Sequence, residues 1–196
     1  DTISGVSGSS APNIGGVITL IDFESQSNAS FSSLTLNSVT FEGVDGNLRT
    51  ANDYAGLFNC MGVRCIDNNE GITTSIKFTF LTPANGFAFN FGASDSIWVL
   101  NAYNSANELL GSVDAPVTLS ENSGDYIGLQ FDSSISYATL ILGTFDYIFI
   151  DNFVFFSGPS AASTLASMTT TSQAIASQFA GFAMSTNYAN MNTYDC

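Results

Sequence analysis

The chain has 196 residues with 3 Lys and Arg against 17 Asp and Glu, no histidine, and a formal net charge of −14. Such a charge opposes binding to nucleic acid and to anionic lipid. The lack of histidine excludes Ser-His-Asp and Cys-His nucleophile pairs and every zinc site that contains histidine. With 45% hydrophobic residues the chain can still build one sizeable core, so we expect a single domain with a tail. Because the catalytic pairs named above are excluded, we expect that it is not an enzyme.

The chain opens with a stretch of small residues. Residues 1–16 include Gly5, Gly8, Gly15 and Gly16 together with several serines. This composition is typical of flexible segments. We therefore predict a flexible N-terminal arm, with regular structure starting at Val17.

Short runs in which apolar and polar residues alternate then recur as far as residue 156, separated by turns rich in Asn, Asp, Gly and Pro. Phe87, Phe89 and Phe91 alternate with smaller residues, which predicts a strand with one face in the core. Lys77 alternates in the same way and is expected to face solvent. These runs predict an antiparallel β-sandwich of the jelly-roll kind over residues 17–157. The runs are 17–23, 34–41, 72–80, 86–91, 97–103, 108–113, 126–131, 134–142 and 147–156.

The pattern changes after residue 157. Residues 158–196 predict a linker and a C-terminal α-helix or tail that carries no charge between Asp151 and Asp195. Such a helix needs a packing partner, either its own sandwich or a neighbouring subunit, stalk or domain. Its apolar stripe, the predicted assembly helix face, consists of Leu165, Met168, Ile175, Phe179 and Phe182.

Three cysteines bear on the compartment. Cys60 and Cys65 lie five residues apart, a spacing that a local disulfide can close in an oxidising compartment. Two thiols in the core are the alternative, and Cys196 is left over for another partner or for none. No apolar run reaches the length of a membrane span. Together with the low content of charged residues, this favours an extracellular or cell-surface protein.

Two stretches resemble a known group. Ile21, Asp22, Phe23 and Glu24, and the later run from Phe149 to Phe155, are similar to the opening and closing strands of extracellular jelly rolls, found in bacterial surface proteins and carbohydrate-binding modules. The strand regions 87–92 and 98–103 look like the sandwich of secreted bacterial proteins of the PEP-CTERM and autotransporter-associated type. The chain lacks that group's apolar C-terminal sorting helix with a basic end.

The resemblance implies a structural calcium ion. In related jelly rolls the first and last strands lie side by side, and their acids, here Glu24 and Asp151, hold the ion. Asp22 and Asn152 could contribute further oxygens. The expectation is chemically reasonable because Ca²⁺ takes six to eight oxygen ligands. The alternative is that these are solvated acids at strand edges.

Two functions fit these features. The first is a non-enzymatic structural or adhesive protein, a self-assembling subunit or module of a cell-surface layer, sheath, filament or adhesin, whose partners are copies of itself or other surface components. The alternative is a carbohydrate-binding module that stacks exposed aromatic side chains on glycans. An enzyme would need two converging carboxylates that the sequence does not reveal. The candidate sugar-stacking residues are Trp98, Tyr103, Tyr126 and Tyr137, although the apolar neighbours of Trp98 favour a place in the core.

Overall fold

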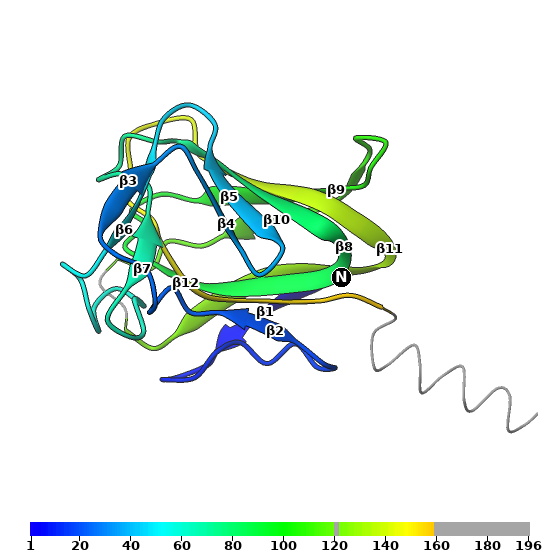
Figure 1. Cartoon of the computed structure of the whole chain (residues 1–196), viewed down its shortest axis with the longest axis horizontal. Helices are drawn as coiled ribbons and strands as arrows, with labels where there is room; N and C mark the ends of the chain where they lie inside the picture. Colours follow the sequence, from blue (N-terminus) through cyan, green and yellow to red (C-terminus); the bar gives the residue numbers. More distant parts are fainter. Residues whose placement is uncertain (120–121, 159–196) are drawn as a thin grey trace, which may run out of the picture. The chain divides into compact units, whose positions relative to one another are not determined.

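A computed structural model gives the fold, and it describes residues 1–119 and 122–158. This part of the chain consists of twelve β-strands paired antiparallel throughout, with no helix among the described residues (Figure 1). No membrane-spanning helix is found in it either. The predicted C-terminal helix lies outside these residues. The strands are β1 (Thr2–Val6), β2 (Thr19–Ile21), β3 (Ala29–Phe31), β4 (Ser33–Leu36), β5 (Val39–Gly43), β6 (Leu48–Ala51), β7 (Cys65–Asp67), β8 (Ser75–Gly92), β9 (Trp98–Tyr103), β10 (Leu109–Ala115), β11 (Asp125–Ile141) and β12 (Phe149–Phe156).

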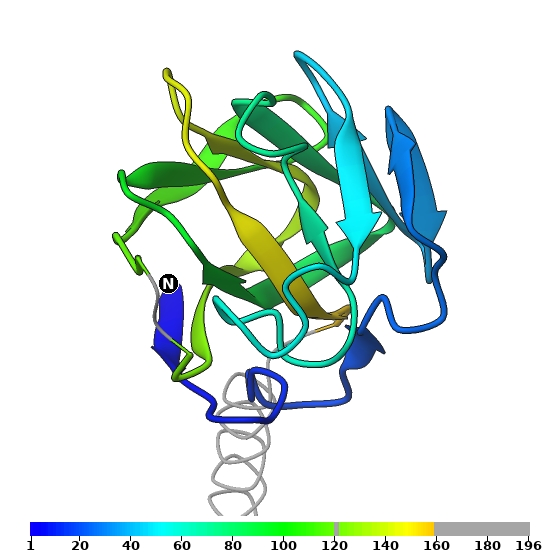
Figure 2. The same ribbon diagram turned by 90° about the vertical axis from the view of Figure 1, so that its left-hand side faces the viewer.

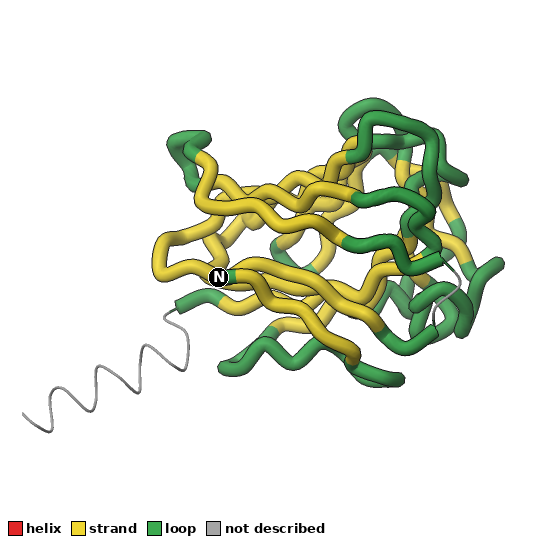
Figure 3. Tube along the Cα trace, turned by 180° about the vertical axis from the view of Figure 1, so that it is seen from behind, coloured by secondary structure: helices red, strands yellow, loops and turns green. Residues whose placement is uncertain are grey.

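The strands form two packed layers, which Figure 3 shows one above the other. Strands β8 and β11 are long enough to run through both layers, and their pairing changes register between Gln130 and Ile135. On one side of this shift the order is β10, β9, β11, β8, β5 and β4. On the other side the order of neighbouring strands in the sheet is β1, β11, β8, β12, β7, β6 and β3. Strand β2 also pairs with β12. The antiparallel sandwich predicted from the sequence is therefore present.

Phenylalanine rings from the two layers meet in the core. Phe41 of β5 and Phe78 of β8 belong to one layer, and Phe89 and Phe153 come from the other. The ring centroids of Phe41 and Phe153 lie 5.2 Å apart, and those of Phe78 and Phe89 lie 5.5 Å apart. All four side chains are fully buried. Because each buried aromatic side chain removes about 150–250 Å² from water, this cluster contributes strongly to the hydrophobic stabilisation.

Several strand predictions are corrected. The runs 72–80 and 86–91 form one strand, β8, and the runs 126–131 and 134–142 form one strand, β11. The run 34–41 is a hairpin instead of one strand, because Asn37 and Ser38 have φ angles of 44° and 70° and form a tight turn between β4 and β5. The second half of β8 is buried on both faces, including Asn90, whereas one solvent-facing side was expected. The reason is that the N-terminal segment and a loop cover its outer face: the Asn90 Nδ2 donates to Ser7 Oγ and to the Gly124 carbonyl.

The expectation of a flexible N-terminal arm is wrong for residues 2–6. These residues form β1, which pairs with β11 over five residues, and Figure 2 shows β1 at the side of the sheet. The sequence does not reveal this strand because its side chains are mostly exposed. Backbone hydrogen bonds to the open edge of β11 hold it, and such bonds leave no hydrophobic pattern.

Candidate functional site

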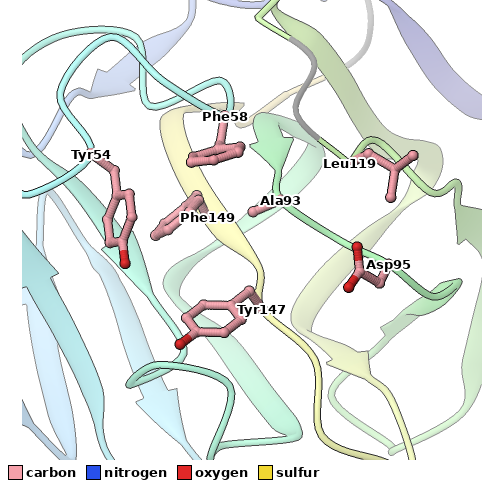
Figure 4. A pocket seen from close by; sticks show the side chains of 7 residues that line it. All are labelled: Tyr54, Phe58, Ala93, Asp95, Leu119, Tyr147 and Phe149. Atoms are coloured by element: carbon pink, nitrogen blue, oxygen red, sulfur yellow. The ribbon is translucent and has the colours of Figure 1, made fainter.

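An open pocket of about 380 Å³ lies at one end of the sandwich, where four connecting segments meet (Figure 4). The loop between β6 and β7 supplies two aromatic residues, and the loop after β8 supplies two residues. The start of β12 with the segment before it supplies two more, and the segment between β10 and β11 supplies Leu119. This volume is within the usual range for small-molecule sites. The lining residues are Tyr54, Phe58, Ala93, Asp95, Leu119, Tyr147 and Phe149.

Aromatic rings make up most of the pocket wall. Phe149 forms the buried floor, with Tyr54 at 4.7 Å and Phe58 at 5.9 Å between ring centroids. Tyr147 lies at the mouth, and the exposed Phe145 packs edge-on against it at 5.9 Å. Rings that are only half buried offer flat apolar faces to a ligand while their other faces are fixed by packing.

The loops that form the pocket carry strained backbone. Phe58, Ala93 and Leu119 have φ angles of 52°, 67° and 46°, a region that favours glycine. Each of these residues lines the pocket. Left-handed conformations of this kind cost about 1–3 kcal/mol each and cluster at binding and active sites. Eight other non-glycine residues of the described part of the chain also have a positive φ, so this strain fits a binding site here but is not specific to it.

A buried carboxylate holds the loop after β8 in place. The side chain of Asp146 accepts hydrogen bonds from the backbone N–H groups of Asp95 and Ser96 at 3.0 and 3.1 Å. It also accepts one from the Trp98 indole at 3.0 Å. Asp146 is 4% exposed. Asp146 directly precedes Tyr147 in the chain. It therefore connects the loop after β8, on one side of the pocket, to Tyr147 on the other side.

The polar groups of the pocket are two hydroxyls and one carboxylate. Figure 4 shows the hydroxyls of Tyr54 and Tyr147 on one side and the exposed Asp95 across from them. Burial raises the pKa of the Tyr54 hydroxyl, and nearby Tyr147 raises it further. Tyr54 therefore stays protonated at neutral pH and can donate a hydrogen bond.

The nearest cation is already engaged. Arg49 donates to Asp67 at 2.9 Å and to Glu70 at 2.7 Å, and it lies 3.6 Å from Asp53. Burial raises the pKa of Asp67, while the Arg49 guanidinium opposes that rise. Three carboxylates around one guanidinium leave no net positive charge to attract an anionic ligand. The charges around the pocket therefore disfavour an anionic ligand.

The predicted sugar-stacking residues occupy different places. Trp98 is fully buried and donates to Asp146, so its role as an exposed sugar platform is wrong. Tyr103 and Tyr137 stack on the outer face of β9 and β11, with centroids 4.7 Å apart. The Lys77 Nζ lies 4.9 Å from the Tyr137 ring centroid, so this lysine lies on the outer face as predicted. Tyr126 lies against Gly5 of β1.

The predicted metal ligands Glu24 and Asp151 approach the same loop. The disulfide between Cys60 and Cys65 closes that loop, with a Cα–Cα distance of 5.4 Å, as their spacing predicts. Glu24 Oε1 accepts the Val63 N–H at 2.7 Å. The two carboxylates thus fix one small loop to the start and the end of the sandwich.

The surroundings of these carboxylates do not fit a calcium cage. The Asp151 oxygens accept N–H groups from Met61 and Asn152, each at 2.7 Å, and Glu24 also accepts the Arg64 N–H. These donors occupy oxygens that Ca²⁺ would need. No group of three or more His, Cys, Asp or Glu residues suited to a metal occurs in the described part of the chain. These hydrogen bonds argue against the calcium ion that the resemblance implies, and a calcium titration is its direct test.

Backbone geometry changes the expected positions of the two further ligands. Strand β2 ends at Ile21, and Phe23 has a φ of 59°, so Asp22 and Glu24 do not share one strand face, although extending the strand alternation of the sequence through Glu24 would place them on the same face. Asp22 is exposed, and its Oδ1 accepts the Glu24 N–H at 3.3 Å. Asn152 has a φ of 43° at a register shift in β12.

Sequence reasoning missed the pocket because its residues come from separate loops without periodicity. Tyr54 and Phe58 belong to a segment in which no strand is predicted, and Tyr147 appears as part of the strand run 147–156. The only available signal is the density of aromatic residues in turns. Such a signal does not indicate which turns meet.

Comparisons with known proteins give distant likenesses. No family model matches the chain, and no curated protein matches it. Solved structures with similar folds include a family 29 carbohydrate-binding module (TM-score 0.38, 12% identity, 73% of this chain and 94% of that chain). Another is the family 6 module of Clostridium stercorarium in complex with cellobiose (TM-score 0.38, 13% identity, 71% and 94%). A third is the catalytic domain of a GH87 α-1,3-glucanase in complex with nigerose (TM-score 0.39, 18% identity, 78% and 30%).

These scores are too low to assign the chain to any of those families. This chain spans less than a third of the glucanase domain's length. The resemblance to PEP-CTERM and autotransporter-associated proteins finds no support among these matches.

Proposed function

We propose that this chain is a carbohydrate-binding protein and that the pocket lined by Tyr54 and Tyr147 binds a neutral sugar. The observation that carries the proposal is the convergence of four aromatic side chains with two hydroxyls and one carboxylate in an open pocket. A pyranose ring has flat C–H faces and a rim of hydroxyls. Aromatic faces pack against the former, and polar side chains bind the latter.

Charge supports a neutral ligand over an acidic one. The chain carries a net charge of −14, and Asp95 is exposed at the pocket itself. Arg49 is neutralised by its three carboxylate partners. A uronate or sulfated sugar would therefore meet repulsion without a compensating cation.

The test is a glycan array that contains neutral, acidic and amino sugars, followed by calorimetric titration of the best binder. Tyr147→Ala should weaken binding about tenfold, because an aromatic contact of this kind contributes roughly 0.5–1.5 kcal/mol beyond its buried area. Tyr147→Phe keeps the ring and should retain most of the affinity. The proposal is wrong if no neutral glycan binds or if Tyr147→Ala binds as well as the parent chain.

Tyr103→Ala serves as the matched control. Tyr103 is also half buried and stacked on another tyrosine, but it lies on the outer sheet face. Its removal should leave binding unchanged. If Tyr103→Ala abolishes binding and Tyr147→Ala does not, the sugar site is the stacked tyrosine pair and the pocket is not the site.

A further inference from the structure

We infer that β1 is an exchangeable strand, so that the segment Asp1–Gly8 of one copy can occupy the edge of β11 in a second copy and join the two chains. The inference is independent of glycan binding. It rests on how β1 is held, on the shape of the edge that receives it, and on the connection that follows it.

Backbone bonds hold the segment almost alone. Its five strand residues pair with Asp125–Leu129, and the Ser7 and Gly8 N–H groups extend the ladder to the Gly124 and Ser123 carbonyls at 2.9 and 3.0 Å. Four of the five β1 side chains are exposed, and none belongs to the buried core. Detaching this segment therefore removes no side chain from the hydrophobic core, but it uncovers Asn90 on the outer face of β8.

The edge that receives the strand is shaped for this particular sequence. A Cβ atom at Gly5 would meet the far end of the Tyr126 side chain, so glycine lets that ring lie directly against the arm. A Cβ atom at Gly124, whose φ is 78°, would collide with the Gly8 backbone. The buried Asn90 donates to the Ser7 hydroxyl at 2.9 Å. An unrelated strand would not satisfy these three contacts, whereas a second copy of this chain satisfies all of them.

The connection to β2 allows the exchange. Residues 9–18 contain no strand, and Pro12 is the only buried residue among them. Gly15 and Gly16 have φ angles of 77° and 72°, and open space surrounds both. Ten residues reach about 33 Å when extended. This length permits the arm to leave its own sheet and pair with another.

Strand exchange re-forms, with β11 of the second copy, every hydrogen bond that β1 loses to its own β11. An empty β11 edge would expose unpaired N–H and C=O groups, which attract another strand. Swapping an identical element is a low-cost route to dimers, and reciprocal exchange closes the pair. If the pocket binds sugar as proposed, a swapped pair would present two pockets to one glycan surface and gain avidity.

The experiment captures exchange with disulfides. Val6 lies directly opposite Asp125 in the ladder, and neither side chain belongs to the buried core. Chains with Val6→Cys and chains with Asp125→Cys, all in a Cys196→Ser background, are mixed at high concentration, diluted, oxidised and run on a non-reducing gel. We expect a mixed disulfide-linked dimer whose yield rises with the mixing concentration. Gly124→Ala in the Asp125→Cys chain should lower that yield at least about tenfold, because alanine is strained at this φ and blocks Gly8.

A fixed hairpin supplies the matched control. Asn101 and Ser112 lie opposite each other in β9 and β10. Asn101→Cys chains mixed with Ser112→Cys chains should give no mixed dimer. The inference is overturned if Val6→Cys/Asp125→Cys closes within one chain while the mixture gives no more dimer than this control. It is overturned equally if that double variant does not close while Asn101→Cys/Ser112→Cys in one chain does, because β1 would then not pair with β11.

Discussion

Burial of Asp151 predicts how the stability of the fold depends on pH. The residue is 1% exposed, and desolvation raises its pKa to about 7, with a smaller rise from the nearby Glu24. Hydrogen bonds from Asn152 and Met61 lower the pKa but do not offset the burial. In the unfolded chain an aspartate titrates near 3.9. The folded state therefore holds this proton more tightly than the unfolded state does.

The sign and size of the effect follow from that difference. Between pH 4 and pH 7 the folded chain keeps a proton that the unfolded chain releases, so the stability due to Asp151 falls as pH rises through this window. A shift of about three pKa units corresponds to about 4 kcal/mol. Below pH 4 the contribution is fully present, and above pH 7 it is lost.

Urea unfolding between pH 4 and pH 8, followed by the fluorescence of Trp98, measures the effect. The parent chain is compared with Asp151→Asn, which cannot titrate, and with Asp22→Asn, which changes an exposed acid. The free energy of unfolding of the parent chain, relative to that of Asp151→Asn, should fall by up to about 4 kcal/mol across the range. A difference that stays constant to within about 1 kcal/mol would refute the reasoning.

The same urea unfolding assay, repeated with and without calcium, tests the calcium prediction. If Glu24 and Asp151 bind Ca²⁺, millimolar calcium should raise the unfolding midpoint at pH 7 and chelator should reverse it, since a ligand that binds only the folded state stabilises it. The N–H groups that already bond to both carboxylates lead us to expect no change. A rise that Asp151→Asn abolishes would establish the metal site.

Three further changes test a buried carboxylate behind the pocket, the disulfide and the aromatic core. Asp146→Ala should lower the free energy of unfolding by about 3–5 kcal/mol and shift the emission of Trp98, because three N–H donors lose their acceptor; unchanged emission would contradict this. Reducing the disulfide between Cys60 and Cys65 should lower the free energy of unfolding in urea by about 2 kcal/mol, because the unfolded chain regains the entropy of a closed loop of six residues. The control Cys60→Ala/Cys65→Ala should show no further loss when reductant is added. Phe153→Ala should cost about 3–5 kcal/mol in the same assay, since its ring contacts rings of both layers; a loss below 1 kcal/mol would show that the cluster repacks.

The sequence predicts the sandwich well where side chains alternate. Ile76, Phe78 and Phe80 point into the core while Lys77 and Thr79 do not, because a strand with one covered face must alternate. Alternation cannot show the short strands β3 and β7, which are three residues long. It also cannot show β1, whose backbone alone is paired.

The candidate site is harder to predict because loop contacts create it. Asn68 illustrates the problem: it lies in an acidic turn, yet it is fully buried, donates to the carbonyls of Thr73 and Asp146, and accepts the Ile148 N–H. Nothing in the local sequence pairs it with a segment 78 residues away. The partners of a buried polar side chain such as Asn68 are known only once the fold has brought distant segments together.

The anchors and the pocket should therefore respond differently to mutation. Asp146 and Asn68 are buried and fix the loops from behind, so removing them should cost stability first and affinity only as a consequence. Tyr54 and Tyr147 are half buried and have free faces, so removing them should cost affinity with little loss of stability. If these loops had only a structural role, substitution at all four positions would lower stability first. The separation of the two effects is what distinguishes a binding pocket from a set of well-packed turns.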